Sequence, residues 1–180
     1  YEATQLAIES IDRALRRNPR RDHRHTLQHC QMADAAQFRR MASLGMCANL
    51  FANHIFYWGD AHHALTMGPD RANRMDACAT AGREGVPFAI HSDAPITPLG
   101  PLFQMIHVQR ISVDAAVRAI TLGAAYTLHM DHLVGSIEVG KYADFCVLDE
   151  DPLAVAADKL KDVPVAGTVI GGRPLALREG

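Results

Sequence analysis

The chain has 180 residues, of which 48% are hydrophobic and 21% charged, a composition typical of a soluble globular protein with a sizeable core. The formal net charge of -2 gives no electrostatic reason to expect nucleic acid or an anionic membrane as a partner. No apolar run in the sequence approaches the length of a membrane span. The cysteines lack CxxC spacing and favour reduced thiols in a cytoplasmic protein: Cys30, Cys47, Cys78 and Cys146.

Helical and strand patterns alternate along the first half of the chain. A helical pattern follows Tyr1 at once, and natural chains rarely begin inside an amphipathic helix, so we expect a piece of a longer protein. The alternation itself is typical of βα units around a parallel sheet. In chain order, the expected elements are a helix over 2–17, a strand over 24–30, a helix over 35–44, a strand over 46–51, a long loop, a helix over 70–84 and a strand over 86–91.

The second half of the chain has a different pattern. Ser112 is a suitable cap for a helix over 113–127, and residues 145–148 are rich in strand-forming side chains. The pair Gly171-Gly172 predicts a hairpin, so we expect a few antiparallel strands outside the βα region. Three parallel strands alone leave open edges, whereas a closed eight-stranded barrel takes about 250 residues. This disfavours a self-sufficient metal-binding domain of this length.

One polar side chain follows each of the three expected parallel strands. His29 ends the first strand, His54 follows the second and Asp93 follows the third. Active sites of parallel α/β folds lie at the carboxyl ends of strands, so we expect these side chains to meet. Imidazole and carboxylate can hold a divalent metal that activates water, and a carboxylate beside that water can carry its proton to a leaving amine. The pattern therefore predicts a hydrolytic metal site.

Several alternatives remain open at this point. A histidine at a strand end is more often structural than a ligand, and Asp93 can simply cap the turn that follows it. Trp58 and Tyr57 either wall a substrate pocket or pack their loop onto the sheet. His62 and His63 are adjacent, so at most one of them is expected to face a site, and a position on the loop surface is favoured for both.

One segment in the second half resembles a known family. Residues 135–152 (GSIEVGKYADFCVLDEDP) closely resemble the segment that leads from the barrel to a small β-sandwich in the amidohydrolase superfamily. Residues 88–103 (FAIHSDAPITPLGPLF) are similar to the last barrel strand and loop of the N-substituted formamide deformylase branch, amidohydrolase family 3. Residues 24–34 and 51–54 resemble its sixth and seventh strands.

The resemblance implies an α/β fold, namely the C-terminal part of a TIM (β/α)₈ barrel (strands 6–8) followed by strands of a β-sandwich. The barrel portion would cover residues 1–130 and the sandwich portion 131–180. It further implies a hydrolase of the C–N bond in a small-molecule amide or formamide-like substrate, with Zn²⁺ as the expected divalent metal. The full-length protein is expected to be a homodimer. The resemblance places the family's other metal ligands upstream of Tyr1, so this chain alone is expected to be inactive.

The resemblance also implies roles for three residues, and two more are expected at the substrate. His29 corresponds to a metal-binding histidine, and Asp93 to an aspartate that is both metal ligand and general base. His54 corresponds to a catalytic histidine that contacts the substrate or transition state. Trp58 and Ser92 are expected to contribute to substrate binding.

Three features depart from the family pattern. Gln28 stands where relatives commonly have Glu, and His91 where a small residue is usual. The stretch over 104–114 is short, which raises the question whether residues are absent between Arg110 and Ile111. Gln28 and His91 suit a rival hypothesis, a non-catalytic binding or regulatory protein that retains an amidohydrolase-like barrel. The substrate, metal number and oligomeric state do not follow from the sequence.

Overall fold

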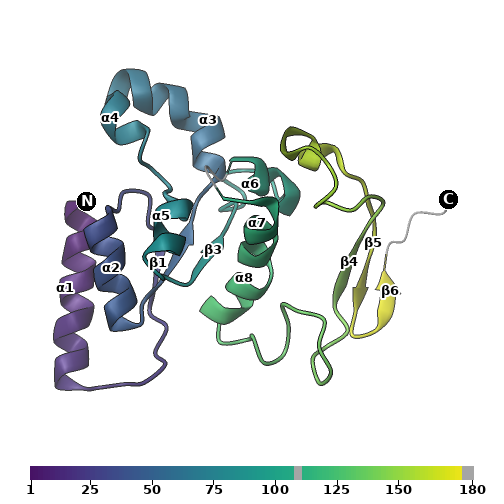
Figure 1. The fold of residues 1–180 in the computed structure, drawn as a ribbon, viewed down its shortest axis with the longest axis horizontal. Helices are drawn as coiled ribbons and strands as arrows, with labels where there is room; N and C mark the ends of the chain where they lie inside the picture. Colours follow the sequence, from purple (N-terminus) through teal and green to yellow (C-terminus); the bar gives the residue numbers. More distant parts are fainter. Residues whose placement is uncertain (108–110, 176–180) are drawn as a thin grey trace.

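The computed structural model of the chain describes residues 1–107 and 111–175 (Figure 1). Its first sheet contains β1 (Thr26–His29), β2 (Cys47–Leu50) and β3 (Phe88–Ile90), in the order β1-β2-β3 with all neighbours parallel. His29 lies opposite Leu50, and Leu50 lies opposite Ile90, so the three strands end at the same level. The predicted parallel sheet is confirmed, and the segments that follow its strands leave from one edge.

The first two helices match the sequence prediction, because local signals define their ends. Helix α1 (Glu2–Arg17) ends at Asn18, directly before a proline. Helix α2 (Ala35–Leu44) begins at Asp34, whose carboxylate accepts a hydrogen bond from the Gln37 backbone N–H, while the Gln37 side chain accepts one from the Asp34 backbone N–H. The helix ends at Gly45 in the left-handed conformation, with φ of +72°.

The expected long loop after β2 is wrong, because this segment is helical. Helix α3 (Asn53–Ala61) follows the strand, then one turn of π-helix (His62–Thr66) and helix α4 (Pro69–Ala72), which together form the arm labelled α3 and α4 in Figure 1. Asn53 and Gly59 suggested a loop. Gly costs only about 1 kcal/mol in a helix interior, however, and Asn53 is anchored by tertiary contact, since its amide donates to Thr97.

The single helix expected over 70–84 is also wrong. Helix α4 ends at Ala72, and a separate helix α5 (Cys78–Arg83) begins six residues later. Asp76 lies in the break with a backbone φ of +48°, and its side chain is fully buried. A helix cannot continue through a residue in this conformation, so burial of the Asp76 carboxyl overrides the local helical pattern.

Helices α7 (Val113–Ile120) and α8 (Leu122–Thr127) pack against β3 of the first sheet, and α6 (Pro101–His107) packs against α3 and α7 (Figure 1). Ser112 caps α7 as predicted, but the helix expected over 113–127 is interrupted at Thr121. Gly123 lets α8 approach the sheet closely, because a Cβ at this position would lie 2.4 Å from the Phe88 carbonyl oxygen. The core lies between the sheet and its helices; its fully buried members include Ile8, Phe38, Met41, Met46, Leu50, Cys78 and Ala81.

The second sheet is antiparallel and contains β4 (Phe145–Leu148), β5 (Val165–Ile170) and β6 (Arg173–Leu175) in that order. The predicted hairpin is confirmed, with Gly171 and Gly172 at positive φ between β5 and β6. A 3₁₀-helix (Ala157–Asp162) links this part to the rest, because Leu160 packs with Met105 and Ala116. The proposed gap between Arg110 and Ile111 lies outside the described residues.

Cys30, Cys47 and Cys78 are free and buried, as expected, whereas Cys146 is free and exposed. Of the described helices, none has both the length and the apolarity needed to cross a membrane.

Candidate active site at the carboxyl ends of the parallel strands

The backbone at this edge of the sheet adopts an unusual conformation after two of the three strands. His29 and Cys30 have φ of +63° and +43°, and Asp93 has φ of +54°. Left-handed backbone is costly for residues other than glycine, although His and Asp tolerate it better than most. Residues with a strained backbone are found frequently at functional sites, where the direction of the side chain matters more than the cost of the strain. The conformations of His29 and Asp93 therefore favour a functional edge.

His29, His54 and Asp93, the three side chains singled out in the sequence, line one pocket of about 370 Å³. Trp58 lines the same pocket, as expected for a residue at the substrate. Sequence reasoning did not place the remaining wall, which consists of Gln31, Phe51, His62 and Ile96. The pocket thus combines three imidazoles and one carboxylate with apolar side chains, a composition common in small-molecule sites.

One helical stripe supplies a wall of this pocket. His54, Trp58 and His62 are spaced four residues apart, so they lie along one face of α3 and the turn after it. The His54 ring meets the edge of Trp58 with ring centroids 5.0 Å apart, and the Nε2 atoms of His54 and His62 are 3.0 Å apart. The expectation that His62 lies on a loop surface is wrong. Its four-residue spacing from Trp58 was the available signal, hidden by the prediction of a loop.

The environment of His54 keeps its imidazole neutral. Partial burial, followed by the nearby rings of His62 and His29, lowers the pKa of His54 to about 4. A neutral imidazole has one N–H donor and one acceptor nitrogen. At neutral pH, His54 is therefore suited to hydrogen bonding with a substrate and not to carrying positive charge.

Ser92 lies apart from the pocket lining, although the sequence suggested a substrate contact. It is only 5% exposed, and its carbonyl accepts a short hydrogen bond from the Thr97 hydroxyl. Asn53, at the start of α3, donates to that same hydroxyl over 2.8 Å. This buried chain fixes the loop after Asp93 to the helix that carries His54. The contact between Ser92 and a substrate stays a prediction, whereas the hydrogen bond from Thr97 to the Ser92 carbonyl is present in the structure.

His91 and Gln28, the two departures from the family pattern, both have local structural explanations. His91 stacks on Phe51 with centroids 5.1 Å apart, and its ring centroid is 5.0 Å from that of His29. The His91 side chain therefore packs against two residues that line the pocket. Gln28 accepts a hydrogen bond from the Asn49 side-chain amide over 2.9 Å, across the pair of neighbouring strands.

Asp76 is a residue that sequence reasoning missed. One of its carboxyl oxygens accepts a hydrogen bond from the Phe51 N–H over 3.2 Å, and its own N–H donates to the Gln31 carbonyl over 2.9 Å. It thereby ties the segment after β1 to the end of β2, and both bonded partners line the pocket. Burial raises the pKa of Asp76 well above its ordinary value, with the Phe51 hydrogen bond opposing this in part.

We expect Asp76→Asn to stabilise the full-length protein increasingly as pH rises above about 4. A raised pKa means that the folded state retains a proton that the unfolded chain releases. The wild-type contribution is therefore complete below the unfolded pKa and declines as pH rises toward the folded pKa. Asn has no such proton and can still accept the Phe51 bond.

Thermal unfolding of wild type and variant at about pH 5 and about pH 8 measures this effect. Asp60→Asn is the matched control, because Asp60 is an exposed carboxylate on α3. A stability difference between wild type and Asp76→Asn that stays constant across this range, or that shrinks with rising pH, contradicts the prediction.

The donor atoms in the pocket suit a divalent metal in kind, since zinc accepts imidazole nitrogen and carboxylate oxygen. A catalytic zinc site takes three protein ligands and one open position. Within residues 1–107 and 111–175, no group of three or more His, Cys, Asp or Glu side chains is placed to hold one ion. His29 and Asp93 could therefore supply only part of the donor set that a catalytic zinc site takes.

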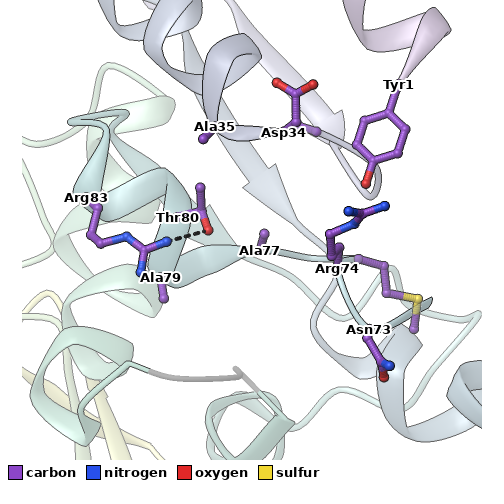
Figure 2. A pocket seen from close by; sticks show the side chains of 11 residues that line it. Tyr1, Asp34, Ala35, Asn73, Arg74, Ala77, Ala79, Thr80 and Arg83 are labelled. Atoms are coloured by element: carbon purple, nitrogen blue, oxygen red, sulfur yellow. Dashed lines mark hydrogen bonds between the residues drawn. The ribbon is translucent and has the colours of Figure 1, made fainter. Parts of the chain in front are cut away.

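A second pocket of about 420 Å³ shares no lining residue with the first (Figure 2). Its carboxylate, Asp34, caps α2, and Arg83 donates to the Thr80 hydroxyl. Arg74 faces the ring of Tyr1, with 6.0 Å from its guanidinium carbon to the ring centroid. Asp34 and Arg83 are thus engaged in local contacts, and the pocket lacks the histidines of the strand edge.

The chain is similar to several known proteins in sequence and in fold. The chain is 27% identical to the N-substituted formamide deformylase of Arthrobacter pascens, over 94% of this chain and 34% of that protein. A metal-dependent hydrolase of Pyrococcus horikoshii superposes with a TM-score of 0.72 at 17% identity, over 87% of this chain and 34% of that one. An adenosine deaminase of Xanthomonas campestris with bound zinc superposes with a TM-score of 0.62 at 20% identity, over 92% of this chain and 42% of that one.

The structural likenesses show a shared fold, and the chain spans about a third of the length of the curated relatives it matches. The family model Amidohydro_3, described as "Amidohydrolase family", matches residues 1–176, nearly the whole sequence. The chain therefore belongs to this amidohydrolase family.

Proposed function

We propose that these residues belong to a longer metal-dependent hydrolase that cleaves the C–N bond of a small amide or formamide-like substrate. The parallel sheet would supply strands 6–8 of a TIM barrel, with the antiparallel strands belonging to a β-sandwich. The observation that carries the proposal is the single pocket lined by His29, His54 and Asp93 at three consecutive strand ends. Membership of the amidohydrolase family, and the likeness to a formamide deformylase, support a C–N bond as the target.

The proposed reaction uses each side chain at a defined step. His29 and Asp93 would be two ligands of a divalent metal, with Zn²⁺ as the expected ion. That ion would supply the Lewis acidity that eases deprotonation of water and polarises the substrate carbonyl. Asp93 accepts the proton of the attacking water and delivers it to the nitrogen as the C–N bond breaks. The products are a carboxylic acid and an amine.

His54 and the apolar wall would bind and orient the substrate. A neutral His54 ring can donate one N–H to the substrate oxygen, where negative charge develops during attack. Trp58, Phe51 and Ile96 form the apolar lining against which an uncharged substrate can pack. The proposed substrate is therefore a neutral amide, held by one directed hydrogen bond and apolar contact.

The rival hypothesis of a non-catalytic barrel protein rested on Gln28 and His91. Gln28 pairs with Asn49, and His91 packs on Phe51, so both residues have structural contacts and neither requires a non-catalytic role. The pocket also retains Asp93, the carboxylate that proton transfer requires. We therefore favour the hydrolase.

The proposal is tested on the purified full-length protein, with its metal content measured by elemental analysis. Metal-loaded and chelator-stripped samples are incubated with a panel of N-formyl and N-acetyl amines, and acid and amine release are quantified. We expect hydrolysis by the loaded sample, loss after stripping and recovery when Zn²⁺ is added back. A fully metal-loaded protein that binds panel members but releases no amine would support the non-catalytic rival instead.

A further inference from the structure

A short chain of hydrogen-bonding groups leads from the surface of the arm to the pocket. Thr66 is exposed, and its hydroxyl lies 2.7 Å from Nδ1 of His62. The other nitrogen of His62, Nε2, lies 3.0 Å from Nε2 of His54. Both histidines line the candidate pocket. The π-helical turn His62–Thr66 creates this arrangement, because it places Thr66 against the ring of His62.

The contact between two Nε2 atoms constrains both rings. A neutral imidazole carries its proton on one nitrogen only, and a hydrogen bond needs one donor and one acceptor. If His62 donates from Nε2, then His54 is protonated on Nδ1 and the Thr66 hydroxyl donates to Nδ1 of His62. If His54 donates from Nε2, then its Nδ1 has no proton and can only accept. The direction of this hydrogen bond therefore determines whether Nδ1 of His54 donates a hydrogen bond to a substrate or accepts one from it.

We propose that His62 is a positioning residue that fixes the ring and tautomer of His54, so that His54 presents Nδ1–H to the substrate oxygen. This inference rests on the proposed function for the choice of tautomer, because a donor is needed where negative charge develops. The order is then Thr66 hydroxyl to His62 Nδ1, and His62 Nε2–H to His54 Nε2. Trp58 supports the same orientation by its edge-on contact with His54.

The chain offers matched variants for a test in the full-length protein. His62→Phe keeps an aromatic ring but removes both nitrogens, whereas His62→Gln keeps a side-chain donor. We expect His62→Phe to lower kcat by about 10–100-fold with little change in KM, as is typical when a partner that orients a functional imidazole is lost. His62→Gln should recover part of that loss. His63→Phe is the control, because His63 is the exposed neighbour in the same turn.

Thr66 provides a second, milder test further along the same chain. Thr66→Val removes the hydroxyl at nearly constant shape, and Thr66→Ser retains it. We expect a smaller fall in kcat for the valine variant and wild-type kcat for the serine variant. Equal activity of Thr66→Val and Thr66→Ser would contradict a role for the Thr66 hydroxyl in holding His62.

A spectroscopic measurement separates this inference from the proposed function. Side-chain ¹⁵N NMR of histidine-labelled full-length protein reports which nitrogen of His54 carries the proton, whether or not the protein hydrolyses anything. We expect His54 protonated on Nδ1 in wild type and a mixture of tautomers in His62→Phe, with the melting temperatures of both proteins compared as a folding control. A His54 tautomer that is unchanged in His62→Phe, or a wild-type His54 protonated on Nε2, would overturn the inference.

Discussion

Asp93→Asn in the full-length protein should lower kcat by about 10²–10⁴-fold, the usual contribution of a positioned general acid or base. Asn has nearly the shape of Asp and retains an oxygen, but it cannot accept the proton of water or return it to the leaving amine. Asp93 is partly exposed in the pocket that also contains His29 and His54, so it is accessible to water and substrate. KM should change little if the substrate is held by His54 and the apolar wall.

Asp60→Asn is the control for this experiment, because Asp60 is an exposed carboxylate outside the pocket. Metal content is measured in the same samples. A fall in kcat with metal retained identifies the proton-transfer role, and a fall that excess Zn²⁺ partly reverses identifies the ligand role. Wild-type kcat in Asp93→Asn would refute both.

His29→Gln should release the metal and with it the activity. Loss of a residue that merely supports a metal ligand costs roughly 10–100-fold in metal affinity or activity, so loss of the ligand itself should exceed this. His29 is the last residue of β1, and its backbone is left-handed, with φ of +63°. This conformation is uncommon for a residue other than glycine, which is consistent with a functional role for its side chain. Metal affinity is measured by competition with a chromogenic chelator, alongside kcat.

His25→Gln is the matched control for this prediction. His25 precedes β1 at its amino end, whereas His29 is the last residue of the same strand. We therefore expect wild-type metal affinity in His25→Gln and strong loss in His29→Gln. Equal affinity in the two variants would show that His29 holds no metal.

The parts of the fold that follow from local chemistry were predictable. Asp34, Gln37 and Gly45 define the ends of α2 through contacts within a few residues. The strand pattern placed β1, β2 and β3, and parallel strands bring their carboxyl ends to one edge. This is why the sequence predicts that His29, His54 and Asp93 meet in one pocket.

The missed features depend on contacts that are distant in sequence. Asn53 begins α3 through a bond to Thr97, 44 residues away, so a segment with loop-like residues became a helix. Once that helix is known, the spacing of His54 and His62 places both rings on one face. From the sequence, Asp76 resembles an ordinary helix residue. Its structural role depends on a buried hydrogen bond from the Phe51 backbone N–H, 25 residues away, which no local pattern reveals.

We propose that the carboxyl ends of β1, β2 and β3 hold part of a catalytic metal site. Anomalous diffraction at the zinc absorption edge, from crystals of the active full-length protein, tests it most directly. We expect a metal peak about 2.0–2.2 Å from an imidazole nitrogen of His29 and a carboxylate oxygen of Asp93, with the remaining ligands from other parts of the protein. A metal peak away from both side chains, or an active protein with no metal at this edge, would contradict it.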